Sequence, residues 1–409
     1  MSSPKPRGAR QSLVRLFAEA RRSGRDGLVV SGHHNTNRIA HLRQPLAFLL
    51  GAESGKVLAK FRTPLPTVEV VPRIWRRESE VLRAVAAHVG EVPRCLADFD
   101  TWSLHGYLDG RALADENPAE RLGSARLLEL AEFFARLAGV PVSELPPLPL
   151  DWPDEGDSAG FLAWLARFAE EEVHQSNRPR FGRLFDAVGI PLDAVDRFMR
   201  SVPKLTGRPF SLLHTDVHRA NVVVVQGPVR DPAPGPVSGP VSDPEGGRLA
   251  VIDWELALYG DPLHDLATHL VRMNYDKSEQ DLMTLMWTDA MRRAGHKDMT
   301  VGMDVDLPVY LGFEYAQSVF PDVMRAALAL PDRPAEEDLA TAAGRVGRAL
   351  RRAREPLGLT EKVPDIRDVS AALREWHAKD RADGTDPADP VVRVDGTPWA
   401  GQEPSSTRR

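Results

Sequence analysis

The pattern of hydrophobic and polar positions predicts a small sheet in the first third of the chain. Short apolar runs at residues 28–32, 47–51 and 57–61 read LVVSG, AFLLG and VLAKF, and segments with Gly, Asn and Pro separate them. Such runs between turn-forming residues are typical of strands. Two later runs, VPRCL and WSLHGYL, fit the same pattern. We therefore predict a small antiparallel sheet.

One amphipathic helix is expected within this region. It follows Pro72, and Ile74, Val81, Leu82 and Val85 share one face of it. An earlier helix is expected in the basic first 27 residues, where an apolar stripe recurs at helical spacing at Leu13, Leu16, Phe17 and Ala20.

The remainder of the chain is predicted to be mainly helical. The helical patterns lie at residues 120–139, 160–175, 279–295, 309–330 and 339–358. Only residues 211–225 and 249–260 read as strands, because they are apolar and rich in β-branched residues. The Pro- and Gly-rich segment 227–247 between them cannot form a helix or a ladder, so we expect it to be a flexible surface loop that closes a hairpin.

Length and composition narrow the class of protein. A chain of 409 residues favours two lobes, and a formal charge of −6 argues against a nucleic-acid partner. Cys95 is the only cysteine, which excludes an internal disulfide framework and a zinc site of several thiolates. The N-terminus lacks the apolar core of a secretory signal, and no run is long enough for a membrane span. We expect a cytoplasmic protein without a membrane partner.

Four polar residues form the strongest candidate site. His214, Asp216 and Asn221 are spaced as H-x-D-x-x-x-x-N, and Asp253 ends the following strand. A hairpin would bring Asp216, Asn221 and Asp253 together. Phosphoryl transfer needs such a group, because a magnesium-bound triphosphate requires oxygen ligands and an acceptor hydroxyl requires a carboxylate to orient it and take its proton.

These motifs resemble those of the aminoglycoside phosphotransferase and choline kinase group within the protein-kinase-like fold. The resemblance adds the motif G-D-P-x-x-D-L-A, which here reads GDPLHDLA at residues 260–267. It implies that Asp216 is the catalytic base, that Asn221 and Asp253 bind Mg²⁺, and that His214 and Asp265 support the catalytic loop. Thr215 stands where the family commonly has glycine.

The resemblance also assigns nucleotide-binding residues to the first region. Lys60 resembles the strand lysine that contacts the α- and β-phosphates, and Glu78 resembles its ion-pair partner, with Glu80 as the competing choice. The remaining expected nucleotide contacts come from a phosphate-covering loop and from the hinge between lobes. They are Ser31, Gly32 and Asn35 in the loop, and Leu104, His105 and Gly106 in the hinge.

The implied architecture is α+β and bilobal, with a small antiparallel-sheet lobe carrying one helix and a larger, mainly helical lobe. The expected boundaries are a basic extension at 1–27, an N-lobe at 28–103, a hinge at 104–108, a C-lobe at 109–383 and a disordered tail at 384–409.

The predicted function is the transfer of the γ-phosphate of ATP or GTP, with Mg²⁺, to a hydroxyl of a small molecule. An aminoglycoside acceptor would make the protein an antibiotic-resistance enzyme and would require an acidic pocket, for which Glu314 and Asp322 are candidates. The alternatives are a metabolic kinase for choline, homoserine, methylthioribose or a ketosamine, and a non-catalytic nucleotide-binding module. The sequence leaves the acceptor, the preferred nucleotide and the oligomeric state open.

Overall fold

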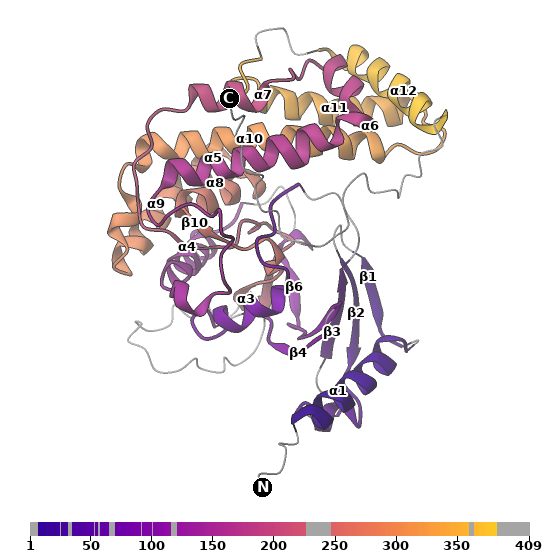
Figure 1. Cartoon of the computed structure of the whole chain (residues 1–409), viewed down its shortest axis with the longest axis vertical. Coiled ribbons are helices and arrows are strands. Elements are labelled where there is room, and N and C mark those ends of the chain that lie inside the picture. The colour runs from indigo at the N-terminus through magenta and orange to yellow at the C-terminus, as the bar shows by residue number, and fades with distance from the viewer. Residues whose placement is uncertain are drawn as a thin grey trace, which may run out of the picture.

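The computed structural model divides into a sheet lobe and a larger helical lobe (Figure 1). The structure describes residues 7–24, 26–31, 35–52, 54–55, 58–64, 70–90, 92–99, 101–115, 121–225, 247–359 and 364–382. The expected loop at 227–247, except Gly247, and the expected tail at 384–409 lie outside these ranges. The predicted α+β architecture is confirmed.

The sheet lobe contains five antiparallel strands in the order β1-β2-β3-β5-β4. They are β1 (Leu28–Ser31), β2 (Asn35–His41), β3 (Leu58–Pro64), β4 (Cys95–Phe99) and β5 (Trp102–Gly106). The strand expected from AFLLG is wrong, because Leu46–Leu49 form the short helix α2, in which Leu46 and Ala47 are buried. The polar strand β2 was missed, since its sequence NTNRIAH lacks an apolar run.

The side chains of β3 and β5 alternate between two environments. Phe61, Trp102 and Leu104 join a small apolar cluster with Ala18 of the first helix, α1 (Arg7–Arg22). The predicted helix is therefore present, and Phe17 of its apolar stripe packs against this cluster. Leu13 and Leu16 are 45% and 58% exposed, whereas Ala18 is buried.

Helix α3 (Glu78–Val85) begins later than Pro72, because Arg77 has extended backbone angles. Trp75 is buried ahead of the helix, and its indole N–H donates to the carbonyl of Pro146 at 3.1 Å. The apolar face of α3, with Val81 and Leu82, belongs to the large core of the helical lobe. This packing fixes the position of Glu78 at the start of the helix.

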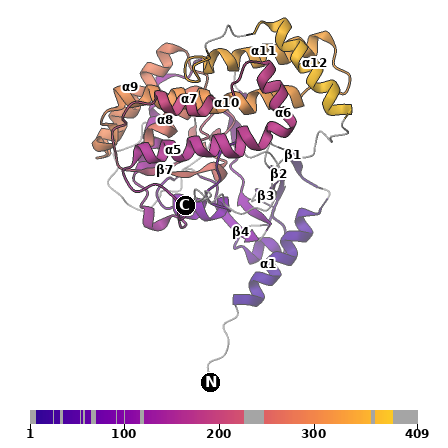
Figure 2. The ribbon, with the colours of Figure 1, turned by 45° about the horizontal axis from the view of Figure 1, so that its top comes forward.

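The helical lobe packs its long helices over a few short strands (Figure 2). Its main helices are α4 (Ser124–Ala138), α5 (Ser158–Phe168), α6 (Ser176–Ala187), α7 (Ala194–Ser201), α8 (Pro262–Arg272), α9 (Lys277–Arg293), α10 (Met303–Leu328), α11 (Glu336–Ala353) and α12 (Ile366–Ala382). A π-helical stretch, Ala169–Gln175, joins α5 to α6. No described helix is both long enough and apolar enough to cross a bilayer.

The strands of this lobe form two small sheets. Strands β6 (Gly110–Ala112), β8 (Val222–Val225) and β9 (Arg248–Val251) make one, and β7 (Ser211–Leu213) pairs with β10 (Leu258–Gly260) in the other. Strands β8 and β9 are antiparallel, so the predicted hairpin is confirmed. Residues immediately before β8 and after β9 consequently lie at the same end of the hairpin.

Candidate active site

The end of the β8–β9 hairpin brings two candidate metal ligands together. Val222 pairs with Val251, and the Ile252 amide donates to the Asn221 carbonyl at 2.9 Å. Asp253 follows directly, with a left-handed φ of 72°. A non-glycine residue rarely adopts this conformation, which costs of order 1–3 kcal/mol and is typical of functional sites.

Asp216 lies next to Asn221 and has both carboxylate oxygens occupied. The Asn221 amide Nδ2 donates to Asp216 Oδ2 at 2.9 Å. Arg272 forms an ion pair with the other oxygen, Oδ1, and His218 Nε2 lies 3.6 Å from the same atom. Burial alone would raise the pKa of Asp216, but the positive charge of Arg272 and the contact with His218 outweigh it and hold this pKa well below its usual range. Asp216 is therefore a carboxylate at neutral pH.

Asp265 of α8 holds the loop that carries Asp216 through hydrogen bonds to its backbone. The two oxygens of Asp265 accept hydrogen bonds from the backbone amides of His214, at 2.8 Å, and Thr215, at 2.7 Å. The His214 ring lies within hydrogen-bonding distance of the Ile252 carbonyl, at 3.2 Å, and of the Asp216 amide, also at 3.2 Å. Burial lowers the pKa of His214 to about 4, so this imidazole is neutral. The loop-supporting contacts expected of His214 and Asp265 are thus present.

Thr215 adopts a left-handed φ of 60°, which explains the preference for glycine at this place in the motif. Its hydroxyl donates to the Leu256 carbonyl at 2.7 Å, and its amide is held by Asp265. Two hydrogen bonds therefore stabilise a conformation that a β-branched residue otherwise disfavours.

The cation that pairs with Glu78 is Arg62. The Arg62 Nε lies 2.9 Å from Glu78 Oε2, and its Nη2 contacts both Asp253 and, at 2.8 Å, Glu255. Arg62 is buried, and the three carboxylates raise the pKa of its guanidinium. The other oxygen of Glu78 accepts from the Trp254 amide at 2.9 Å. This group of contacts connects β3, α3 and the residue that follows the hairpin.

The expected ion pair between Lys60 and Glu78 is therefore not formed, and the partner predicted for Glu78 was wrong. Lys60 and Arg62 are two positions apart in β3, so both point to the same face of the strand. Burial, with the charge of Arg62 second, lowers the pKa of Lys60. Sequence analysis missed Arg62, although its position two residues after Lys60 in the same strand is the pattern that could have identified it.

The choice between Glu78 and Glu80 is decided by burial. Glu78 is 8% exposed and faces Arg62. Glu80 pairs instead with Arg77 at the surface.

The three predicted hinge residues have different environments. The Leu104 backbone pairs with both Phe61 and Ala97, and its side chain lies in the small apolar cluster, so it is poorly placed to meet a nucleotide base. The Gly106 amide already donates to the Arg94 carbonyl at 2.8 Å. His105 is buried with its Nδ1 atom 3.8 Å from Glu78, and burial lowers its pKa to about 3. Its ring nitrogens form no hydrogen bond with described residues.

The predicted phosphate-covering loop coincides with the connection between β1 and β2. Ser31 ends β1 and Asn35 begins β2, while Gly32 lies outside the described residues. The side chains of Ser31 and Asn35 also lie outside the described part of the chain.

Asp253 and Asn221 suit a magnesium ion that is bound together with phosphate oxygens. Asn221 uses its amide nitrogen on Asp216, which leaves its amide oxygen as the possible ligand. Burial would raise the pKa of Asp253, but Arg62 and Lys60 lower it below the usual value, so its carboxylate is charged. Among the described residues no group of three or more His, Cys, Asp or Glu side chains could hold a metal alone. Mg²⁺ commonly binds through one or two protein oxygens, substrate phosphates and water, which this pair permits.

The two predicted acceptor acids lie on α10, which packs against α8. Glu314 is buried, and its Oε1 accepts from Arg272 Nε at 3.1 Å. Asp322 is half-buried, and burial raises its pKa despite the nearby Arg325 and Arg352. Arg272 therefore links the candidate base Asp216 to Glu314, a connection that the sequence pattern did not reveal.

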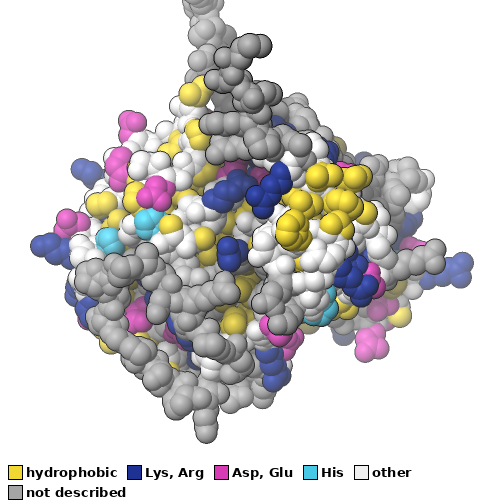
Figure 3. Space-filling model, turned by 90° about the horizontal axis from the view of Figure 1, so that it is seen from below, with side chains coloured by type: hydrophobic (Ala, Val, Ile, Leu, Met, Phe, Trp, Pro, Cys, Tyr) yellow, Lys and Arg dark blue, Asp and Glu magenta, His cyan; other side chains and the backbone are white. Residues whose placement is uncertain are grey.

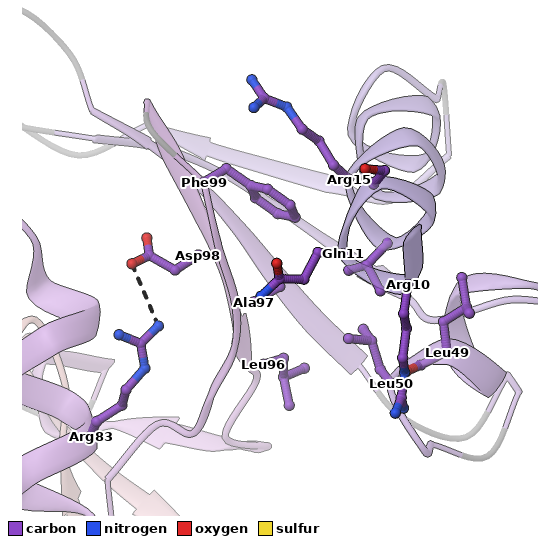
Figure 4. Close-up of a pocket in the computed structure, with 12 residues that line it drawn as sticks. Arg10, Gln11, Arg15, Leu49, Leu50, Arg83, Leu96, Ala97, Asp98 and Phe99 are labelled. Carbon is purple, nitrogen blue, oxygen red and sulfur yellow. Dashed lines mark hydrogen bonds and ion pairs between the residues drawn. The ribbon is translucent and has the colours of Figure 1, made fainter. Parts of the chain in front are cut away.

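A separate cavity of about 780 Å³ lies beside α1, which packs on the face of the N-lobe sheet that points away from Lys60 and Arg62 (Figure 4). It is lined by α1, α2, β4 and Arg83, whose guanidinium is 3.5 Å from Asp98. Figure 3, which views the molecule from the lower end of Figure 1, shows a group of hydrophobic side chains beside Lys or Arg side chains. The cavity shares no lining residue with the group around Asp216.

Comparisons with known proteins identify the family of this chain. The family model described as "Phosphotransferase enzyme family" matches residues 36–230 and 241–296, which is more than half of the chain. The chain therefore belongs to this phosphotransferase family. No match was found among curated proteins.

Solved structures with the same fold include a proposed aminoglycoside phosphotransferase from Ralstonia eutropha JMP134. It is 16% identical, its TM-score is 0.50, and the match covers 87% of this chain and 99% of that one. Plasmodium vivax ethanolamine kinase is 10% identical at a TM-score of 0.46, covering 83% of this chain and 85% of that one. A choline/ethanolamine kinase family protein from Mesorhizobium loti is 16% identical at a TM-score of 0.45, and the match covers 88% of this chain and 99% of that one.

Proposed function

We propose that this phosphotransferase transfers the γ-phosphate of ATP or GTP to a hydroxyl group of a small molecule, with Mg²⁺ as the metal. The observation that carries the proposal is the convergence of Asp216, Asn221 and Asp253 at one end of the hairpin, opposite the Arg62–Glu78 ion pair. Carboxylate, amide and guanidinium groups in this arrangement match the requirements of a loose, highly charged transition state.

Each residue has a distinct proposed role. Asp216 orients the acceptor hydroxyl and takes its proton, because it is a charged carboxylate on a loop fixed by Asp265. Asn221 and Asp253 would hold Mg²⁺, which neutralises charge on the phosphate oxygens. Arg62, which pairs with both Glu78 and Asp253, holds Asp253 in position from the N-lobe side, and Lys60 on the same face is the candidate phosphate contact.

The test is a nucleotide-consumption screen of the purified protein with Mg²⁺ and a panel of aminoglycosides and hydroxylated metabolites. We expect turnover that depends on both the acceptor and the metal. Asp216→Asn should reduce kcat by about a hundredfold or more, while the exposed Asp154→Asn should leave it unchanged. Failure of wild-type protein to bind magnesium-nucleotide would exclude the proposal, including its antibiotic-resistance version.

An aminoglycoside and a metabolite remain the two candidate acceptor classes. A polycationic drug requires free acidic groups, and Glu314 is already neutralised by Arg272. This contact favours a metabolite.

A further inference from the structure

Arg272 extends from the end of α8 into the group around Asp216. Its Nη1 pairs with Asp216 Oδ1, and its Nε donates to Glu314 Oε1 at 3.1 Å. Within the described part of the chain its third nitrogen, Nη2, forms no hydrogen bond. The side chain is 23% exposed, so this nitrogen belongs to a group that solvent or a ligand can reach.

Glu314 cannot serve as a free acid for a cationic acceptor. One of its oxygens is held by Arg272, and the other accepts from the Gln317 amide. The side chain is only 3% exposed. A buried carboxylate whose two oxygens are both occupied has little capacity to bind an added amine.

A second arginine, Arg325, lies on the same face of α10 as Glu314. Positions 314 and 325 are eleven residues apart, close to three helical turns, and helical side chains tilt toward the N-terminus. Arg325 is exposed and lies near enough to Arg272, Asp322 and Asp216 to interact with their charges. It forms no ion pair within 4.0 Å with another described residue.

The donors left over beside Asp216 belong to arginines. The acids Asp216, Glu314 and Asp322 are matched by Arg272, Arg325 and Arg352, and Arg272 alone pairs with two of these acids. Arg352 is anchored to the Asn274 side chain at 3.2 Å. An ammonium group entering this region would meet guanidinium groups, whereas a carboxylate or phosphate would find unused N–H donors in a geometry suited to it.

We propose that the acceptor carries an anionic group, a carboxylate or a phosphate, close to the hydroxyl that is phosphorylated, and that Arg272 and Arg325 bind this group. The inference rests on the proposed function, because it assigns the acceptor class of the same site. Binding of the anion to Arg272 also gives the acceptor hydroxyl a position beside Asp216 Oδ1. Both arginines are then specificity-determining residues that contact the acceptor.

The experiment measures acceptor binding by calorimetry to the full-length protein loaded with Mg²⁺ and the non-hydrolysable ATP analogue AMP-PNP. One arm uses glycerate and gluconate, and another uses glycerol 3-phosphate and glucose 1-phosphate. Glycerol and glucose are the neutral references, and choline and kanamycin the cationic ones. We expect at least one anionic compound to bind about tenfold more tightly than its neutral reference and than either cation. The responding arm identifies the anion as carboxylate or phosphate.

Variants then assign the preference to the two arginines. Arg325→Gln should weaken binding of the anion about tenfold and leave the neutral reference unchanged. Arg272→Gln is combined with Glu314→Gln, so that Glu314 does not remain as a buried acid without its cation, and should have the same effect. Arg292→Gln removes an exposed arginine at the end of α9 and should change nothing.

Three results would overturn the inference. They are equal or tighter binding of choline or kanamycin, no binding by any anionic compound, and anion binding that survives both variants. If kanamycin is phosphorylated in an Asp216-dependent manner, the proposed function stands and this inference fails. If AMP-PNP with Mg²⁺ does not bind at all, the proposed function fails and the inference with it.

Discussion

Arg62 and Glu78 form a buried ion pair, with 2.9 Å between Nε and Oε2, that connects the centre of the N-lobe sheet to the first turn of α3. The same guanidinium reaches Asp253 and Glu255 on the other side of the site. Because α3 packs on the core of the helical lobe, this contact fixes the position of the sheet relative to the hairpin end that carries Asp253.

The first prediction is that Arg62 matters more than Lys60 for nucleotide use. Arg62→Lys keeps the charge but loses the planar fork that serves three carboxylates, so kcat/KM for magnesium-nucleotide should fall about ten- to hundredfold. Lys60→Met removes a side chain that pairs with none of the described acids within 4.0 Å, and should cost only a few-fold. Steady-state kinetics at varied nucleotide concentration measure both effects.

The control for this comparison is Arg43→Lys, a conservative change at an exposed arginine that pairs with Asp26. Melting temperatures of all three variants separate lost activity from lost folding. A severe loss in Lys60→Met together with near-normal Arg62→Lys would reverse the assignment.

The second prediction concerns metal dependence at Asp253. Asp253→Asn should weaken nucleotide binding about tenfold or more when Mg²⁺ is present, because the charged ligand is removed. Binding of metal-free nucleotide should stay the same or become tighter, since the same change removes a negative charge near the phosphates. Calorimetric titration of nucleotide with and without Mg²⁺ measures these two binding affinities separately, with the exposed Asp154→Asn as control. Equal losses in both titrations would mean that Asp253 holds the site together without binding metal.

The contact between Asp216 and Asn221 was predictable from sequence because the two residues are local in the chain and fixed by motif spacing. Asp216 and Asn221 are five positions apart, and two strands with β-branched residues sufficed to predict the hairpin that adds Asp253. The Arg62–Glu78 pair was not predictable in the same way. A strand places Lys60 and Arg62 on one face, and only the tertiary position of α3 decides which of them meets the glutamate.

The misjudged elements have similar causes. The run AFLLG has no periodicity long enough to separate a strand from a helical turn, and tertiary packing of Leu46 and Ala47 decided for the helix. Arg272 was overlooked because it ends an apolar helix, where an arginine ordinarily serves as a solvated cap. Its contacts with Asp216 and Glu314 join residues 56 and 42 positions apart, which no local pattern reports.

The third prediction is a loss of stability in mild acid caused by buried neutral histidines. Burial lowers the pKa of His214, His264 and His269 to about 4, below the ordinary value of 6.5. The unfolded chain therefore binds protons that the folded chain excludes. The stabilisation is fully present above pH 6.5 and is lost as the pH falls toward 4, with each histidine contributing up to about 1.4 kcal/mol per pH unit.

Asp265 acts in the opposite direction. Burial raises its pKa to about 6, so protonation between pH 6 and its ordinary value of 3.8 favours the folded chain. Burial raises the pKa of Asp261 and Asp322 in the same sense, whereas the pKa of His105, lowered to about 3 by burial, acts like those of the other histidines. The lowered pKa values of Asp216 and Asp253 add to the loss, so the free energy of unfolding should still decrease on acidification. Urea unfolding at a series of pH values measures this slope. His264→Phe should make it shallower, whereas the exposed His41→Gln should leave it unchanged, and a flat profile in wild-type protein would contradict the argument.

The fourth prediction concerns the buried network around Arg208, which supports the helical lobe without reaching the proposed reacting groups. Arg208 forms ion pairs with Asp261 and Asp306, and its Nη2 donates to the Val301 carbonyl at 3.1 Å. The guanidinium and both carboxylates are essentially fully buried. Asp261 also accepts from the Leu263 amide at the start of α8, the helix that carries Asp265 and Arg272.

Removing the cation should leave two buried carboxylates unpaired. Arg208→Met is therefore expected to destabilise the protein by about 3–5 kcal/mol, equivalent to a fall in Tm of roughly 5–15 °C. Because Arg208 contacts neither Asp216 nor Asp253, the protein that remains folded at low temperature should keep a near-normal kcat. Calorimetric melting and low-temperature kinetics test the two parts, with Arg200→Met, an arginine whose side chain is 64% exposed, as the matched control. An unchanged Tm would show that the network is not needed for stability. A lost kcat in folded protein would show that α8 transmits its position to the catalytic loop.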